Sequence, residues 1–576
     1  MYTQESSGRY FVKTSSYALT ITANCIDFIV AGEVLAGLRP VSAVNTCGKE
    51  NKANDDAETG QVKLSASIEN GIATYIWESS SSLWEKKEYI VRCFETHFEY
   101  SVRVTGRGAV DTVNYFSGNL SEGKQGSMYE FDMGFTPIVT VTGQKQCYFS
   151  AMESQEVFSY LMIPPMFVYS FSTPGVAPKI AFGLAADRGE HNFTQFNYKT
   201  HSDANRRRFW FWTDQSGHTV VNGTWETPKV LCYVAESDMA ALKVYSDYYF
   251  TAGLAKHKSP GEKRPRFWYG PMTCGWLEQY AYGNRHGGKY TSYAECTALA
   301  CEEVYRNLAK ELQEKKLYPK IMIIDDKWQH SYGDQYPNKD QWPDLRAFID
   351  ENRDKNGIYT MLWFKLWDAE GLEEDMCMWD PKENRRVADP TNPKYRERLK
   401  AMLYHLLSSD EGCCNAYGLK LDYAFWQPVG RGARSYSGKY GVELFLELIS
   451  YIYRCVKEIK PEAIVNCSPC HPLFVEFCDQ ARLHDYYIDL RRCYEEFSFR
   501  KEIYEIAMPG VLFDTDGAAF SSYRDTMRYM RLAPTLGIPD LYCISPMPSL
   551  ELSADDWDCV SKVWAEYDKR IDRMFE

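Results

Sequence analysis

The spacing of apolar residues divides the chain into two parts. Residues 1 to about 255 alternate apolar and polar positions, as at 17–37 and 136–152, and turn-forming residues separate these segments. Alternation with a period of two is typical of half-buried strands, whereas few stretches here have the 3.6-residue period of a helix. This half of the chain therefore predicts a large antiparallel β-sandwich.

Beyond a basic, proline-containing stretch at 255–266, which we interpret as a linker, short apolar segments alternate with amphipathic ones. The eight predicted strands span 267–273, 320–325, 358–364, 418–422, 463–466, 481–483, 510–513 and 541–544. Helices are predicted between them, for example at 292–316 and 392–409, and a last helix at 554–575 closes the series. Such alternation is typical of parallel βα units and, in this number, of a (β/α)8 TIM barrel.

These patterns predict a multidomain β plus α/β protein, with an N-terminal β-sandwich at 1–262 and a catalytic (β/α)8 barrel at 263–576. A chain of 576 residues is also too long for one ordinary core. No apolar run approaches the roughly 20 residues that a membrane helix needs. The first residues lack a basic region followed by an apolar stretch, which predicts a cytoplasmic protein unless a signal has been removed.

Charge and cysteine content narrow the range of partners. The formal net charge of −13 argues against nucleic acid and against an anionic membrane surface. Eighteen cysteines in this length are too sparse for a disulfide scaffold, and without a signal they are expected to stay reduced. The stretch CSPCH at 467–471 matches the haem-attachment pattern but lacks the second cysteine pair of a zinc site. We interpret it as a turn after a strand.

The ends of the predicted barrel strands carry an unusual set of polar and aromatic residues. Chemistry in such barrels takes place at the carboxyl ends of the strands. The residues at these ends are Trp276, Asp325, Asp326, Trp328, Trp363, Lys365, Trp367, Lys420, Asp422, Arg482, His484 and Asp485. Carboxylates and cations hydrogen-bond hydroxyl groups, and tryptophan covers the apolar face of a pyranose, so the set predicts a sugar site.

Lys420 and Asp422 lie two residues apart on one strand, so both side chains point to the same side, into the barrel. We expect the lysine to keep Asp422 ionised, as a nucleophile must be, while it binds a sugar hydroxyl. Asp485 is expected to have a raised pKa and to act as general acid. The two carboxyl groups should then lie roughly 5–7 Å apart, the spacing of a retaining pair.

Other interpretations of the same residues stand beside this one. A lysine and an aspartate on one strand are more often a structural ion pair. Two aspartates after an apolar strand are commonly a turn or a helix cap, and tryptophans at strand ends can belong to the core. The three signals together, each at a strand end, favour the sugar site.

The region from about 265 to 545 resembles the family thirty-six glycoside hydrolases, the α-galactosidase and raffinose-synthase group related to family twenty-seven. The block IMIIDDKWQ through TMLWFKLW is similar to that family's DDxWQ motif and GLWF strand. VADPTNPKYRERL resembles its stretch before strand four, KLDYAFW its nucleophile motif, and ARLHDYY its acid/base motif.

The resemblance implies roles for individual residues. Asp422 matches the nucleophile and Asp485 the acid/base. Asp325 and Asp326 match the pair that binds O4 and O6 of the sugar, and Lys420 and Arg482 match groups near O2 and O3. The remaining substrate-binding matches are the aromatic residues Trp276, Trp363 and Trp328 and, in the family's C-S-G-G loop, Cys467. The family's enzymes retain anomeric configuration and need no metal or organic cofactor.

This chain departs from the family pattern near the sugar. Lys327 replaces a glycine, Lys365 a glutamate and His484 a serine, while Pro469 and His471 replace small residues. The resemblance predicts a retaining α-glycosidase that hydrolyses terminal α-galactosides of an oligosaccharide or glycoconjugate. A transglycosylase of the raffinose-synthase type and a non-catalytic carbohydrate-binding barrel are the alternatives, and self-association into a homo-oligomer stays open.

Overall fold

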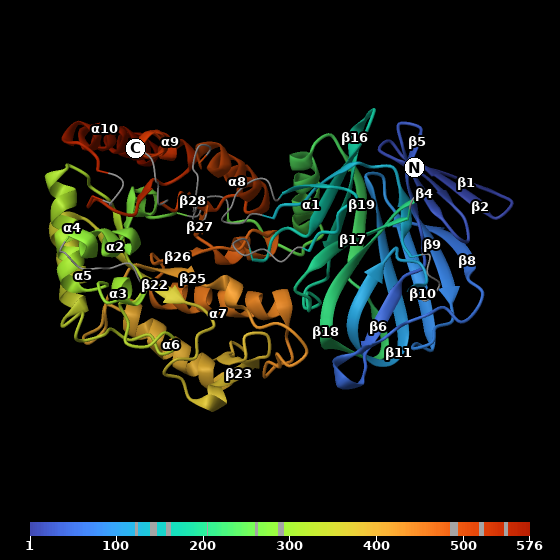
Figure 1. Cartoon of the computed structure of the whole chain (residues 1–576), viewed down its shortest axis with the longest axis horizontal. Helices are drawn as coiled ribbons and strands as arrows, with labels where there is room; N and C mark the ends of the chain where they lie inside the picture. The colour runs from blue at the N-terminus through green and yellow to red at the C-terminus, as the bar shows by residue number, and fades with distance from the viewer. Residues whose placement is uncertain are drawn as a thin grey trace.

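The computed structural model describes residues 1–120, 125–138, 147–156, 163–203, 206–259, 263–285, 293–483, 493–517, 523–546 and 551–576. A large antiparallel sheet occupies the N-terminal half and a parallel barrel the C-terminal half (Figure 1). A β-sandwich followed by a (β/α)8 barrel is the predicted fold, and it is confirmed. The predicted boundary between residues 262 and 263 adjoins residues outside the described part, so it stays a prediction.

Nineteen strands of the described residues form the N-terminal sheet. They are β1 (Tyr2–Ser6), β2 (Arg9–Lys13), β3 (Ala18–Ile21), β4 (Ile26–Val30), β5 (Glu33–Leu38), β6 (Ala43–Cys47), β7 (Ala53–Asn54), β8 (Lys63–Glu69), β9 (Ile72–Ser79), β10 (Lys86–Cys93), β11 (His97–Tyr115), β12 (Ser127–Tyr129), β13 (Met133–Phe135), β14 (Tyr148–Ser150), β15 (Val168–Thr173), β16 (Val176–Ala185), β17 (Phe196–Asp203), β18 (Arg206–Glu226) and β19 (Lys229–Ala235). A short 3-10 helix, η1 (Lys49–Asn51), follows β6. The long strands β11 and β18 pair with each other through a register shift between Val110 and Thr112.

The core of this half is aromatic, as the alternating pattern predicts. Phe28 on β4 meets Phe98 on β11 with ring centroids 5.1 Å apart and meets Phe182 on β16 at 6.5 Å. Edge-to-face contacts of this kind add to the free energy gained by burying the rings. Strands far apart in sequence thus share one core.

The sequence pattern missed helix α1 (Asp238–Thr251), which follows the last strand of the sheet. Ser237 caps its N-terminus by accepting from the amide of Ala240. The helix packs against the sheet on one side and against barrel helix α8 (Cys493–Ala507) on the other, where Ser246 donates to the carbonyl of Ile506 at 2.7 Å. Because it is covered on two sides, it lacks the single apolar stripe that marks a surface helix.

In the described part of the chain, the barrel sheet consists of eight parallel strands in the order β28, β27, β26, β25, β22, β21, β20, β29. Their bounds are β20 (Met272–Cys274), β21 (Ile321–Ile324), β22 (Tyr359–Lys365), β25 (Gly418–Asp422), β26 (Ile464–Cys467), β27 (Gln480–Arg482), β28 (Leu512–Asp514) and β29 (Asp540–Leu541). Among the described residues, the backbone pairing that closes the ring between β28 and β29 is an isolated bridge of Asp514 with Ile538. Every predicted strand therefore has a counterpart, most of them shifted by one or two residues.

The helices and short elements of this half surround the strands (Figure 1). They are η4 (Arg266–Tyr269), α2 (Trp276–Arg285), α3 (Tyr293–Thr297), α4 (Glu302–Glu314), α5 (Leu345–Asn356), η5 (Glu374–Met376), the hairpin β23 (Cys377–Asp380) and β24 (Arg385–Ala388), α6 (Pro393–Leu407), η6 (Ala424–Trp426), α7 (Gly441–Ile459), η7 (Pro472–Phe477), α8, α9 (Tyr523–Leu536) and α10 (Ala554–Phe575). None of the described helices is long and apolar enough to cross a membrane.

Two predicted elements are wrong in detail. The first strand was predicted at 267–273, but its first part is the 3-10 helix η4, and the strand itself is β20. The predicted helix at 292–316 is broken between α3 and α4. There the side chain of Gln341 donates to the carbonyls of Thr297 and Ala298, and the indole of Trp342 donates to that of Ala300 at 2.7 Å. These carbonyls therefore have partners other than helix amides.

The CSPCH stretch forms a turn after a strand, as interpreted from the sequence. Cys467 ends β26, and His471 caps η7 by accepting from the amide of Leu473. The other ring nitrogen of His471 meets the hydroxyl of Tyr245 at 3.1 Å, which links this turn to α1. All cysteines whose side chains the structure describes are free thiols.

Candidate active site

The predicted nucleophile, Asp422, is the last residue of β25. Its Oδ2 accepts from the indole N–H of Trp363 at 2.9 Å, and its Oδ1 accepts from Arg482 at 3.0 Å and from the amide of Tyr423 at 2.8 Å. Its side chain is 28 % exposed, whereas Arg482 is 4 % exposed. The three donors fix the orientation of this carboxylate, and its exposed part is accessible to a bound molecule.

The charge of Asp422 follows from these neighbours. Burial alone would raise its pKa, but Arg482, then Lys420, and the hydrogen bonds from Trp363 and Arg482 together lower the pKa well below its usual range. Asp422 is therefore ionised at neutral pH. The structure differs from the sequence expectation in one respect, because Arg482 is the direct partner of this carboxylate and Lys420 acts on it from a greater distance.

Lys420 forms an ion pair with Asp325 across the barrel interior. Its ammonium lies 2.8 Å from Asp325 Oδ2, and it also donates to Cys274 Sγ at 3.4 Å and to the hydroxyl of Tyr542 at 3.3 Å. Burial alone would lower the pKa of Lys420, but the pairing with Asp325 raises that pKa well above its usual range. The ion pair is as strongly buried as a purely structural ion pair would be. Its position at the carboxyl ends of the strands, however, is that of residues in a barrel active site.

The adjacent aspartates are held by a second set of contacts. Asp325 accepts from the thiol of Cys274 at 3.0 Å and from the amide of Asp326 at 3.0 Å, and its own amide donates to the hydroxyl of Tyr305 at 2.7 Å. Gln279 donates to the carbonyl of Asp326 at 2.7 Å. Both aspartates are buried, and the peptide bond from Asp326 to Lys327 is cis.

A glycine allows Tyr305 to reach the site. A Cβ at Gly275 would lie 2.1 Å from the Tyr305 hydroxyl oxygen, so only glycine leaves room for that ring. The same hydroxyl donates to Gln279, which places Tyr305 between the backbone of Asp325 and the start of α2. The arrangement fixes the backbone of the Asp325–Asp326 pair.

The predicted tryptophans have different positions. Trp363 contacts Asp422 directly. Trp328 is fully buried and donates to the carbonyl of Trp363 at 2.8 Å, so it lies behind that residue. Trp276 begins α2 and is partly exposed, with its ring edge-on to Tyr280 at 5.3 Å.

Cys467 is buried at the end of β26, where burial and Cys478 raise its pKa well above the usual range. The neighbouring Ser468, which the sequence analysis did not single out, accepts from Arg482 at 2.9 Å and so orients that side chain. Tyr542 and Cys274 were missed in the same way. His484 and Asp485 lie outside the described residues, so the predicted separation of the two carboxyl groups stays a prediction.

Lys327 and Lys365 are each paired within the chain. Lys365, at the end of β22, lies 3.0 Å from Asp368, and its ammonium sits 3.8 Å from the ring centroid of Tyr332. Lys327 contacts the same ring at 4.0 Å and Glu370 at 3.0 Å. Cation–π contacts and acidic partners thus compensate both charges.

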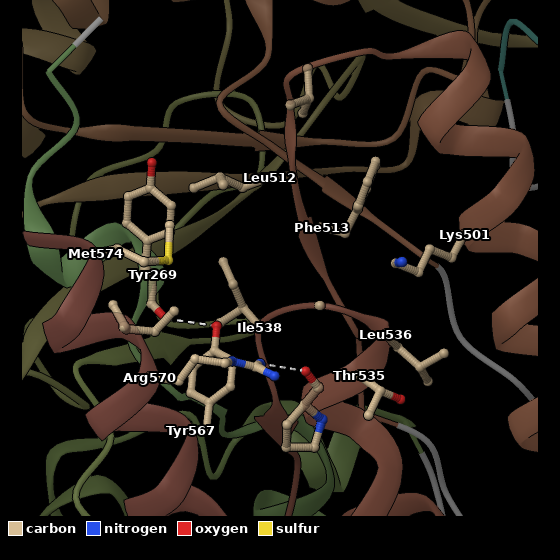
Figure 2. A pocket seen from close by; sticks show the side chains of 14 residues that line it. Tyr269, Lys501, Leu512, Phe513, Thr535, Leu536, Ile538, Tyr567, Arg570 and Met574 are labelled. Atoms are coloured by element: carbon tan, nitrogen blue, oxygen red, sulfur yellow. Dashed lines mark hydrogen bonds between the residues drawn. The ribbon is translucent and has the colours of Figure 1, made fainter. Parts of the chain in front are cut away.

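A separate hollow of about 480 Å³ lies between the start of β28, the end of α9 and helix α10. Figure 2 shows Leu512, Thr535, Tyr567 and Arg570 at its walls. The guanidinium of Arg570 donates to the carbonyl of Pro534 at 2.7 Å. Because barrel chemistry takes place at the opposite ends of the strands, we do not assign the active site to this hollow.

Comparisons with known proteins support the fold. No protein-family model matches the sequence, and no curated protein matches it. Among solved structures, an α-N-acetylgalactosaminidase from Bifidobacterium bifidum superposes with a TM-score of 0.58 at 11% identity, over 99% of this chain and 93% of that one. The galactosidase domain of an α-galactosidase–sucrose kinase gives 0.54 at 11% identity, over 99% and 86%.

An α-galactosidase from Thermus thermophilus in complex with stachyose gives a TM-score of 0.50 at 13% identity, over 87% of this chain and 99% of that one. At these identities the likeness shows the fold alone. The chain therefore has the β-sandwich and barrel architecture found in these solved glycosidases.

Proposed function

We propose that the protein is a glycoside hydrolase, a retaining α-glycosidase that removes terminal α-galactosyl groups by double displacement. The observation that carries the proposal is Asp422. It is a strand-end carboxylate that Arg482 keeps ionised, that Trp363 and a backbone amide orient, and that remains partly exposed. These are the requirements for a carboxylate nucleophile.

In the proposed reaction, Asp422 Oδ attacks the anomeric carbon while a general acid protonates the leaving glycosidic oxygen. The glycosidic bond breaks, and a covalent glycosyl ester forms on Asp422. Water, deprotonated by the same acid/base group, then attacks the anomeric carbon and releases the sugar with retained configuration. Asp485 is the proposed acid/base, a role that rests on the family resemblance.

The sugar is proposed to lie over the buried floor formed by Asp325, Asp326 and Lys420. Carboxylates at one strand end can accept from an axial O4 and from O6 together, and the ammonium of Lys420 can donate to a neighbouring hydroxyl. An equatorial O4 would leave a buried carboxylate without that partner, which is the strong form of substrate rejection. The named substrates of the solved relatives, α-galactosides and an α-N-acetylgalactosaminide, agree with this preference.

The pairing of Lys327 and Lys365 argues against an acidic sugar as the substrate. Each ammonium has an acidic partner and an aromatic ring, so neither leaves an uncompensated positive charge for a carboxylate or sulfate group. A neutral hexose is therefore the better match. Transfer to a second sugar and sugar binding without turnover are the two alternatives.

One experiment separates these possibilities. Purified protein is incubated with p-nitrophenyl α-galactoside, α-N-acetylgalactosaminide and α-glucoside, and the first-formed sugar is followed by proton NMR. The proposal expects release of the α-anomer from a galacto-configured substrate, and Asp422→Ala should abolish it while Asp340→Ala, a change at an exposed aspartate, should not.

The β-anomer as first product would contradict double displacement. Glycosides formed in excess of free sugar on addition of an acceptor would favour the transglycosylase. Binding of the galactosides without turnover, unchanged in Asp422→Ala, would favour the carbohydrate-binding barrel.

A further inference from the structure

Three aspartates with no part in the proposed reaction lie together inside the barrel. Asp514 ends β28, Asp516 follows two residues later, and Asp540 begins β29. One carboxylate oxygen from each lies within 4.8 Å of the others, and all three side chains are buried. Such a group of buried carboxylates is costly unless a positive charge or protons compensate it.

Several oxygens of this cluster have no hydrogen-bond donor among the described residues. They are both carboxylate oxygens of Asp540 and Oδ2 of Asp516. Asp540 is only 6 % exposed. Asp514 has two hydrogen-bond donors, because it accepts from the side chain of Asn466 at 2.8 Å and from the amide of Asp516 at 2.8 Å. The oxygens without a donor therefore belong both to Asp516, which follows β28, and to Asp540, which begins β29.

The nearby cations are already engaged. Lys420, which faces Asp516 and Asp540, is bound to Asp325 at 2.8 Å, and Arg482, which faces Asp514, is bound to Asp422 at 3.0 Å. Among the described residues, these two cations thus face five carboxylates, Asp325, Asp422, Asp514, Asp516 and Asp540. The three carboxylates of the cluster therefore need a further cation or protons to compensate them.

We propose that Asp514, Asp516 and Asp540 bind a divalent cation of the oxygen-preferring kind, Ca²⁺ or Mg²⁺. Carboxylate oxygens are the ligands of both ions, and Ca–O distances of 2.3–2.6 Å allow ligand atoms up to about 5 Å apart across the ion. This site departs from the absence of metal that the family resemblance implies, and the proposal does not rest on the proposed hydrolysis.

The position of the cluster gives the cation a structural role. Asp514 and Asp516 belong to the β28 side of the barrel and Asp540 to the β29 side, two edges that the described residues join through an isolated bridge and through hydrogen bonds of the Thr515 side chain to Ile538 and Asp540. An ion bound by all three joins these edges. It adds a link between the two edges to the isolated bridge found there.

The same cation acts on the candidate active site through Tyr542. The hydroxyl of Tyr542 donates to Asp516 Oδ1 and accepts from Lys420 at 3.3 Å. Gly517 permits this, because a Cβ there would lie 2.4 Å from the Tyr542 ring. An ion that fixes Asp516 therefore fixes Tyr542 and, through it, Lys420.

Protons are the competing occupants. In the cluster without a cation, burial and Asp516 raise the pKa of Asp514 to about 6, and burial together with Asp514 and Asp516 raises the pKa of Asp540 well above its usual range. A cation must displace these protons, so it binds more tightly as pH rises. The test is therefore made at pH 8.

The full-length protein is analysed for Ca and Mg by mass spectrometry as purified, then stripped with EDTA and titrated separately with CaCl2 and MgCl2. Calorimetry gives the stoichiometry and affinity, and differential scanning fluorimetry gives Tm. We expect about one divalent ion per chain, and a Tm that rises by several degrees with the ion that binds more tightly.

Asp540→Asn and Asp516→Asn should each weaken binding at least tenfold, and Glu566→Gln, which removes an equal charge from an exposed position on α10, should leave it unchanged. No uptake of either ion by the wild-type protein at millimolar concentration would overturn the proposal and leave protons as the occupants. Unchanged affinity in both aspartate variants would overturn the assignment to this cluster. The wild-type titration decides the matter even where a variant does not fold.

Discussion

Replacing Lys420 by methionine tests whether the ion pair with Asp325 is as important to stability as its burial implies. The two charged groups lie 2.8 Å apart, and each side chain is 4 % exposed. Removing one member of a buried pair leaves the other charge uncompensated, which costs about 3–5 kcal/mol. The carboxylate that is left behind can instead take up a proton. Protonating any carboxyl of ordinary pKa at pH 7 costs about 4 kcal/mol, so the loss of stability is limited to about that value.

We therefore expect Lys420→Met to lower the free energy of unfolding by about 3–4 kcal/mol at pH 7, and by less as the pH falls toward 5. Adding Asp325→Asn to this variant should restore part of the loss, because the second change removes the uncompensated charge. A coupling free energy of about 2–3 kcal/mol between the two positions is expected.

The assay is urea unfolding, followed by tryptophan fluorescence and by circular dichroism, for the wild type, both single variants and the double variant. Lys562→Met serves as control, since Lys562 pairs with Asp558 on the exposed face of α10 and its loss should change stability little. A Lys420→Met protein within about 1 kcal/mol of the wild type would refute the reasoning, because that is the range of exposed pairs.

Three further predictions concern the proposed reaction. Asp422→Ala should lose turnover by about a thousandfold or more while the protein stays folded, and azide should restore part of the turnover as a glycosyl azide. Measurement of kcat and of the circular dichroism spectrum decides, and retention of more than a few per cent of the rate would indicate another nucleophile. Arg482→Gln should raise the pKa of Asp422, so the acidic limb of the kcat/KM profile should move to higher pH; an unmoved limb would contradict the ion pair. The wild type is expected to prefer an α-galactoside over the matched α-glucoside in kcat/KM on the order of a thousandfold, and Asp326→Asn should reduce this preference. Equal preferences in the two proteins would show that Asp326 does not recognise the sugar.

Most of the barrel could be predicted from the sequence because its strands are short apolar runs between amphipathic helices. The polar strand ends were visible for the same reason, since a charged residue inside an apolar run is easily noticed, as with Lys420 and Asp422. Helix α1 escaped because it is covered on two sides. The break before α4 escaped because its carbonyl partners, Gln341 and Trp342, lie some 40 residues later in the sequence.

The contacts within the site were harder to predict than its members. Alternation along β25 places Lys420 and Asp422 on one side, but it does not say which cation each acid meets. That choice depends on the order of strands around the barrel, which brings Arg482 from β27 to Asp422 and leaves Lys420 for Asp325, the residue after β21. Nor does the spacing of Asp514, Asp516 and Asp540 indicate that β28 and β29 meet at the barrel seam.

This division of cations bears on how the proposed enzyme would work. A nucleophile and a sugar-binding acid close together would repel each other if they shared one positive charge, and one of them would gain a proton. Here Arg482 serves Asp422 and Lys420 serves Asp325, so both carboxylates have their own partner. Loss of Lys420 should therefore damage sugar binding and stability first, whereas loss of Arg482 should change the pH dependence of the chemical step. If both residues belonged to a single structural ion-pair network, loss of either one would cause the same defect. Different defects in the Lys420 and Arg482 variants would therefore distinguish the two arrangements.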